Sequence, residues 1–175
     1  IKVQKNFEYR SEEKFIKIEP SDNELIIDFE IVYKNSLIKS QREQINLSKD
    51  SLKEIYESRT FCLFEDIDKI KKMGLAKGGT LENAIVIKNN EILNEAGLRH
   101  KNEFVKHKIL DCMGDLMLSS YGIFGKVTCS QGGHKITNEF LRKFFSDKNN
   151  YTLVEFKENK IPNTSIYSKS LAATA

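Results

Sequence analysis

The chain has 175 residues, of which 39% are hydrophobic, 30% are charged and only two are proline. This composition excludes a disordered or fibrous protein and is typical of one sizeable core or two small lobes. Its 28 basic and 25 acidic residues give a net charge of +3, and the lysines are scattered among glutamates, so charge gives no support to nucleic-acid binding.

The sequence carries no targeting or membrane-spanning signal. No run of about 18 apolar residues occurs, and the first residues, "IKVQKNFEYRSEEKF", lack the apolar core of a signal peptide. We therefore expect a cytoplasmic protein without stable membrane insertion. The cysteines, Cys62, Cys112 and Cys129, form no CxxC motif, and we predict three small buried side chains rather than a disulfide framework or a thiolate metal site.

The first half of the chain predicts strands followed by short helices. Residues 7–33 contain "FEYR", "KFIKIEP" and "ELIIDFEIVY", which alternate or run apolar and predict the antiparallel start of a sheet. The segment "LSKDSLKEIYES" predicts a helix with Ser48 as its N-cap. A second helix is predicted over about 64–73, ended by Gly74.

The second half mixes a hairpin, strands and longer helices. "NAIVIKNNEILN" predicts a hairpin turning at Asn89-Asn90, and "NEFVKHKILDCMGDLMLSS" predicts the longest helix. "IFGKVTCSQ" predicts a buried strand, "GGH" a turn, "NEFLRKFFSD" a last helix capped by Asn138, and "YTLVEF" a short strand. This order predicts an α+β fold with helices layered on a largely antiparallel sheet. The tail from Lys157 has little apolar periodicity, and we expect it to be loosely held.

The longest helix carries a polar stripe. His107, Asp111 and Asp115 follow one another in steps of four, so they lie on one face of the helix. An imidazole and a carboxylate at this spacing can bind a divalent ion together, and a catalytic zinc takes three protein ligands, so a third would come from elsewhere, with His100 and His134 as candidates in this chain. The same spacing also occurs in ordinary surface pairs, and spacing alone leaves both interpretations open.

Lysines flank this stripe. Lys106 and Lys108 next to a metal would suit an anionic substrate such as a phosphate ester, but lysines on a helix are also commonly just solvated. The segment "RTF" at 59–61 is undecided between an ordinary turn and a functional segment.

Longer segments carry a specific resemblance. The run "GGTLENAIVIKNNEILNEAGLRHKNEFVKHKILDCMGDL", followed by "IFGKVTCSQGGHKITNEFL", is similar to the second half of the UDP-3-O-acyl-N-acetylglucosamine deacetylases, zinc enzymes of lipid A biosynthesis. "SRTF", "LNEAGLR", "FVKHKILDxxGDL" and "GHxxxN" occur in the family's order and close to its spacings. The resemblance extends from "IKVQ" to about Phe156.

The resemblance implies one half of a two-domain enzyme. Residues 1–156 would form the second domain, with a βαβ insert at about 62–87 that lines a passage for the substrate's acyl chain, and 157–175 would be a C-terminal tail. The implied reaction is zinc-dependent hydrolysis of the acetamide of UDP-3-O-acyl-N-acetylglucosamine to the free amine and acetate, the committed step of lipid A biosynthesis. The family's third zinc ligand and its general base lie in the preceding N-terminal domain, which is then the implied partner, and the chain is expected to be inactive alone.

The resemblance also implies roles for single residues. His107 and Asp111 match the family's two zinc ligands on this helix. His134 matches the histidine that stabilises the oxyanion and protonates the departing amine, Asp115 its carboxylate partner, and Thr60 a hydroxyl that helps hold the tetrahedral intermediate. The implied substrate-binding residues are Lys108 at the diphosphate, Phe61, and Tyr33 near the uracil.

One phosphate contact of the family is not implied for this chain, because relatives often carry a lysine where this chain has Gln131.

Two further interpretations remain beside the deacetylase. A non-catalytic lipid- or protein-binding module with a vestigial metal site is the main alternative, although retention of the whole matching set argues against it. A related metal hydrolase acting on another amide is disfavoured by the acyl-passage segment "CLFEDIDKIKKMGLAKGG".

Overall fold

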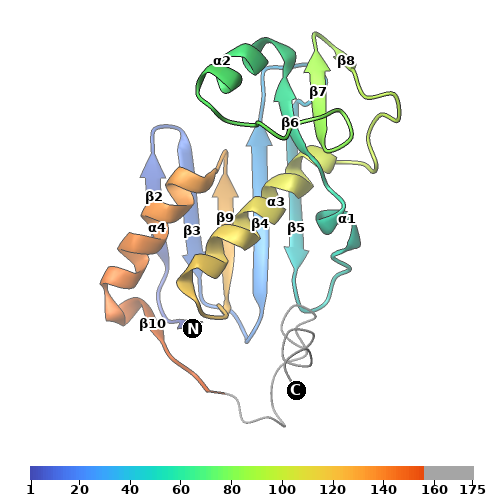
Figure 1. Ribbon diagram of the computed structural model, residues 1–175. Coiled ribbons are helices and arrows are strands. Elements are labelled where there is room, and N and C mark those ends of the chain that lie inside the picture. Colours follow the sequence, from blue (N-terminus) through green and yellow to red (C-terminus); the bar gives the residue numbers. More distant parts are fainter. Residues whose placement is uncertain (156–175) are drawn as a thin grey trace, which may run out of the picture.

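Two long helices lie across one face of a five-stranded sheet in the computed structural model, which describes residues 1–155 (Figure 1). The end of the expected domain at 156 and the expected tail at 157–175 lie outside the described residues. The order of the strands in the sheet is β2 (Phe7–Ser11), β3 (Lys14–Glu19), β9 (Gly125–Ser130), β4 (Leu25–Val32) and β5 (Ser40–Asn46). Only β4 and β9 pair in parallel, which confirms a largely antiparallel sheet and the α+β class.

The core lies between this sheet and helices α3 (Glu103–Leu116) and α4 (His134–Ser146). In β3 the residues that face the helices, Ile16 and Ile18, are buried, and they alternate with the less buried Phe15, Lys17 and Glu19 on the opposite face. This period of two is what places one apolar face of a strand against a helical layer. Phe104 of α3 and Phe140 and Phe144 of α4 are the largest fully buried side chains that the two helices contribute.

A separate three-stranded sheet stands at one end of the molecule (Figure 1). It consists of β6 (Thr60–Leu63), β7 (Ala84–Lys88) and β8 (Glu91–Ile92). The parallel pair β6–β7 is joined by a 3₁₀ turn (Phe64–Asp66) and helix α2 (Ile67–Lys72), which is a βαβ unit. The expected insert is therefore present, with its first strand beginning two residues before the predicted position.

The remaining elements are short. They are α1 (Lys53–Tyr56), 3₁₀ turns at Met117–Ser119 and Lys148–Asn150, and the strand pair β1 (Lys2–Val3) and β10 (Tyr151–Thr152). Of the predicted strand "YTLVEF", the residues that the structure describes form a strand only at Tyr151–Thr152. No helix within residues 1–155 is both long and apolar enough to cross a membrane.

Two predicted helix starts were wrong. Helix α4 begins at His134 and not at Asn138, because extended Gly133 is its N-cap, and the Asn138 side chain accepts a hydrogen bond from Arg142 within the helix. Ser48 caps no helix. It lies in a turn held by Asn46, whose side chain accepts the Ser48 N–H, and helix α1 starts only at Lys53.

The prediction that all three cysteines are buried is confirmed for two of them and wrong for Cys62. Cys112 and Cys129 are buried in the core, whereas Cys62 on β6 is only partly buried. The reason is that β6 belongs to the small sheet of the insert, which has no second helical layer as broad as that over the main sheet.

Candidate active site

The polar stripe of helix α3 runs along one side of the helix. Nε2 of His107 lies 3.5 Å from Oδ1 of Asp111, and both side chains are half-buried. Asp115, one turn further, is buried. The stripe therefore lies in a partly enclosed position, where charged groups interact more strongly than on an open surface.

The other ring nitrogen of His107 contacts the backbone. Nδ1 lies 3.2 Å from the carbonyl oxygen of Ser58. A carbonyl oxygen only accepts hydrogen bonds, so this contact is a hydrogen bond only when Nδ1 carries a proton. In the neutral ring that tautomer leaves the lone pair on Nε2, which faces Asp111.

These two side chains fit a zinc ion as donors. A neutral imidazole nitrogen and a carboxylate oxygen are both zinc ligands, and a hydrogen bond from the second imidazole nitrogen to a carbonyl is typical of metal-binding histidines. Within residues 1–155 no group of three or more His, Cys, Asp or Glu side chains is arranged to hold a metal. Nε2 of His100 lies 3.2 Å from Oγ of Ser58, and among the described residues His100 forms no such group with the stripe. The described residues thus offer two ligands, His107 and Asp111.

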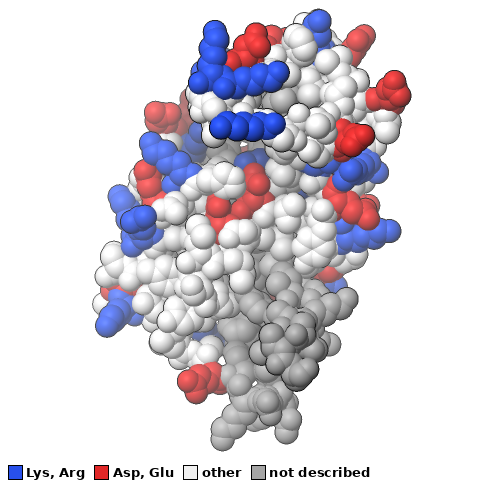
Figure 2. Space-filling model, viewed as in Figure 1, with Lys and Arg blue, Asp and Glu red and all other residues white. Residues whose placement is uncertain are grey.

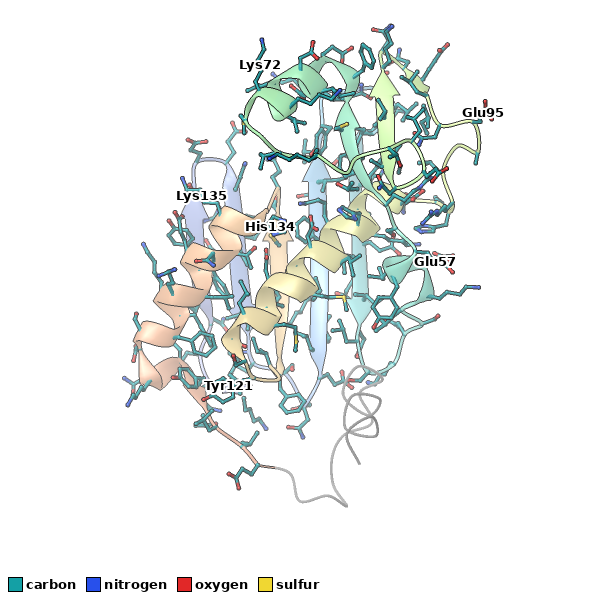
Figure 3. The ribbon with its side chains drawn as sticks, viewed as in Figure 1. Glu57, Lys72, Glu95, Tyr121, His134 and Lys135 are labelled. Carbon is teal, nitrogen blue, oxygen red and sulfur yellow. The ribbon has the colours of Figure 1, made fainter. Side chains whose placement is uncertain are left out.

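His134 and Asp115 form a hydrogen-bonded pair. Nδ1 of His134 lies 2.8 Å from Oδ1 of Asp115, and the histidine side chain is 70% exposed while the carboxylate is nearly covered. Figure 3 labels His134 at the beginning of α4. The carboxylate orients the ring through Nδ1, and Nε2 remains open to a substrate. Oδ2 of Asp115 is buried and has no hydrogen-bond partner among the described residues.

A tight turn delivers His134 to this position. Gln131 has a left-handed backbone (φ 53°), and its N–H donates to Glu30. A Cβ at Gly132 would lie 2.2 Å from Sγ of Cys129, so only glycine fits beside that thiol. Burial raises the pKa of the Cys129 thiol to about 12, although the Gly132 N–H acts in the opposite direction. The thiol is therefore a packing group.

Thr60 and Phe61 lie at the start of the insert, and Phe61 packs against Tyr33, just after β4, and against Phe104 of α3. The ring centroids of Tyr33 and Phe61 are 5.7 Å apart, and those of Phe61 and Phe104 are 4.9 Å apart, both pairs edge to face. Burial raises the pKa of the Tyr33 phenol. Thr60 and Phe61 also line a cavity of about 620 Å³ between β6, α2 and β7. Most of its other lining is apolar, including Cys62, Ile67, Ile70, Ala84 and Val86.

The lysines beside the stripe have carboxylate partners. Nζ of Lys108 lies 2.7 Å from Oδ2 of Asp111, and Lys106 pairs with Glu54. The structure thus places Lys108 directly beside Asp111 of the candidate metal site.

Sequence reasoning missed a buried ion pair beneath the site. Glu103 continues the stripe one turn toward the start of α3 and binds Arg59, the residue before Thr60. The spacing of four was a usable signal, but a glutamate in the first turn of a helix is normally explained by the helix dipole.

Comparison with known proteins gives a consistent family assignment. The family model described as UDP-3-O-acyl N-acetylglycosamine deacetylase matches residues 1–146. Three proteins named UDP-3-O-acyl-N-acetylglucosamine deacetylase are similar to this chain. That of Haemophilus ducreyi is 36% identical over 91% of this chain and 53% of its own length, that of Helicobacter pylori 39% over 88% and 52%, and that of Campylobacter fetus 38% over 98% and 58%.

The chain spans about half the length of these curated relatives. The match over residues 1–146 covers most of the chain, including both helices of the site. The chain therefore belongs to the UDP-3-O-acyl-N-acetylglucosamine deacetylase family.

Proposed function

We propose that the full-length protein containing this chain hydrolyses the acetamide of UDP-3-O-acyl-N-acetylglucosamine, releasing acetate and a free amine in the cytoplasm as the committed step of lipid A biosynthesis. The observation that carries the proposal is the line of His107, Asp111 and the Asp115–His134 pair on one side of helix α3. Two metal donors and an oriented, exposed histidine within two helical turns are what metal-assisted amide hydrolysis requires.

His107 and Asp111 are the proposed zinc ligands, with a third ligand and the general base supplied by the remaining half of the protein. When bound, zinc supplies a Lewis acid for the amide carbonyl and a water of lowered pKa. Lys108, whose Nζ lies 2.7 Å from Oδ2 of Asp111, is the proposed contact for the diphosphate of the substrate.

His134 is the proposed proton donor to the departing amine. Asp115 holds Nδ1 of His134, so Nε2 faces the substrate and its proton can pass to the nitrogen as the C–N bond breaks. The hydroxyl of Thr60 donates a hydrogen bond where negative charge develops on the amide oxygen.

The insert is proposed to bind the acyl chain and the nucleotide base. The apolar lining of the 620 Å³ cavity suits a hydrocarbon chain. The Tyr33–Phe61 pair beside it provides aromatic faces for the uracil.

Acetate release and zinc content test the proposal. The chain is produced alone and together with the other half of its full-length protein, and both samples are given UDP-3-O-acyl-N-acetylglucosamine. We expect zinc and activity only when both halves are present, and His134→Ala in the complete protein to lower the rate about 100- to 1000-fold. A complete protein that releases no acetate, or a His134→Ala variant with wild-type turnover, would contradict the assignment and favour the binding module.

A further inference from the structure

One peptide unit lies between two side chains of helix α3. The Ser58–Arg59 peptide donates its N–H to Oε1 of Glu103 at 3.0 Å, and its carbonyl oxygen lies 3.2 Å from Nδ1 of His107. Glu103 and His107 are four residues apart, so they leave the helix on the same side, about 6 Å apart along its axis. The N–H and C=O of a trans peptide point in opposite directions, so holding one end aims the other.

Glu103 is a rigid anchor for this peptide. Its side chain is fully buried, and Oε1 accepts hydrogen bonds from the backbone N–H and Nε of Arg59, at 3.0 and 2.9 Å. Oε2 accepts from Nη2 of Arg59 at 3.2 Å and from the backbone N–H of Arg99 at 2.7 Å. A buried carboxylate is stable only when paired and hydrogen-bonded in this way, and any rotation would break several of these bonds.

Arg59 is fixed equally firmly. Its side chain is 6% exposed, and Nη2 also donates to the carbonyl of Gly97 at 2.7 Å. The planar guanidinium thus connects α3 to the loop before it in a geometry that a lysine cannot reproduce.

We propose that Arg59 and Glu103 are a positioning pair for the candidate metal site. They hold the Ser58 carbonyl oxygen next to Nδ1 of His107. This contact favours a proton on Nδ1 and directs Nε2 toward Asp111. Because Arg59 directly precedes Thr60, the same pair also sets where β6 begins relative to α3. The proposal rests on the proposed zinc site of His107 and Asp111.

A pair that only stabilised the fold would have different consequences. Its loss would lower the melting temperature without changing a correctly folded metal site. A positioning pair, in contrast, affects the ring of His107 directly, and loss of such outer hydrogen bonds typically weakens metal binding about 10- to 100-fold.

The test uses Glu103→Gln in the full-length protein, with Glu95→Gln as the matched control at an exposed position. Zinc affinity is measured by competition with a chelator, and the His107 tautomer is read from the ¹⁵N shifts of its ring nitrogens in the zinc-free protein. We expect zinc binding to weaken about 10- to 100-fold in Glu103→Gln, and its His107 ring to become a mixture of tautomers. Glu95→Gln should match the wild type in both measurements.

Arg59→Lys provides a milder second variant, because it keeps the positive charge but loses the planar guanidinium that donates from both Nε and Nη2. Circular dichroism selects the variants that fold. A folded variant of either kind with wild-type zinc affinity and a pure Nδ1–H tautomer overturns the proposal. The wild type provides a test even if neither variant folds, since a neutral, zinc-free His107 whose single proton is on Nε2 would refute the assignment. Neither measurement uses substrate, so a lack of deacetylase activity would refute the proposed function without affecting this test.

Discussion

Gly132 is the residue at which the turn before His134 is most tightly constrained. An added Cβ would lie 2.2 Å from Sγ of Cys129 and 3.1 Å from Cζ of Phe29, and both neighbours are buried. We expect Gly132→Ala to lower the free energy of unfolding by about 1–3 kcal/mol, the usual cost of overpacking a core. Urea unfolding followed by circular dichroism measures this loss.

Two further variants test that explanation. Cys129→Ala combined with Gly132→Ala removes the clashing sulfur and should recover most of the lost stability. Gly133→Ala is the matched control, because its backbone is extended (φ −175°) and no atom lies within 4 Å of its added Cβ. A Gly132→Ala variant as stable as Gly133→Ala would show that the turn is not held by this packing.

The Arg59–Glu103 pair predicts a pH dependence of stability. Burial alone would raise the pKa of Glu103, but the hydrogen bonds from the Arg59 side chain and from the backbone of Arg59 and Arg99 lower it overall. A lowered folded-state pKa stabilises the protein above the ordinary glutamate pKa, and this stabilisation is lost as the pH falls through the folded value. Breaking a buried pair costs about 3–5 kcal/mol, so we expect Glu103→Gln to lose about that much at pH 7 and progressively less in acid.

Urea unfolding at several pH values measures this difference in stability. Glu95→Gln should show no such trend, because Glu95 is exposed. A Glu103→Gln deficit that is the same at pH 7 and at low pH would mean that the charge of Glu103 does not cause the stabilisation.

At the scale of single residues, spacing predicted the polar stripe but not what lies behind it. His107, Asp111 and Asp115 share a face because helical periodicity requires it. The contact of His107 with Ser58 crosses 49 residues of chain, and no local pattern encodes such a pairing. Long-range hydrogen bonds of this kind depend on how the insert strand meets α3, which only the folded chain determines.

At the scale of elements, the prediction succeeded where periodicity was strong. Helix α3 and the antiparallel opening of the sheet follow directly from apolar residues that recur with periods of 3.6 and 2 residues. The start of α4 was misplaced because Asn138 resembles a cap, whereas the extended backbone of Gly133 decides where the helix begins. Short elements were also misjudged, since α1 and β10 receive their length from tertiary packing rather than from propensity.

Cys62 on strand β6 is expected to be the reactive thiol of the folded protein. Cys62 lines the insert cavity and is partly exposed, whereas Cys112 and Cys129 are buried with pKa values that burial raises strongly. We expect Ellman's reagent to modify one thiol of the folded protein quickly and the other two only on unfolding.

Substrate protection connects this thiol to the acyl passage. A UDP-3-O-acyl-N-acetylglucosamine whose chain enters the cavity should slow the fast reaction, and UDP alone should not. Cys62→Ser is the control, because it should abolish the fast phase. Rapid labelling of two thiols, or equal rates with and without the acylated substrate, would argue against this arrangement.

At the scale of the whole molecule, the outer side of the helical layer has an apolar surface. In the view of Figure 2 the described surface in the lower part of this side shows few charged side chains. A groove of about 210 Å³ lies between α1 and the end of α3, lined by residues including Tyr56, Leu110 and Tyr121. Leu118, just beyond α3, is 64% exposed. Because the chain is about half as long as its relatives, we expect the other half of the full-length protein to pack on this surface.

Leu118→Lys tests this packing. A lysine at an exposed position should leave the stability of this chain within about 0.5 kcal/mol of the wild type, yet it places a charge in the expected contact with the other half. With the two halves produced separately, we expect the variant to bind the other half at least about tenfold more weakly, since burying an unpaired charge costs more than 1.4 kcal/mol. Leu75→Lys, an exposed leucine of the insert, is the matched control and should bind normally. Sedimentation velocity measures the association. Equal binding by both variants would place the other half elsewhere, and the zinc site of His107 and Asp111 would then need its third ligand from a different direction.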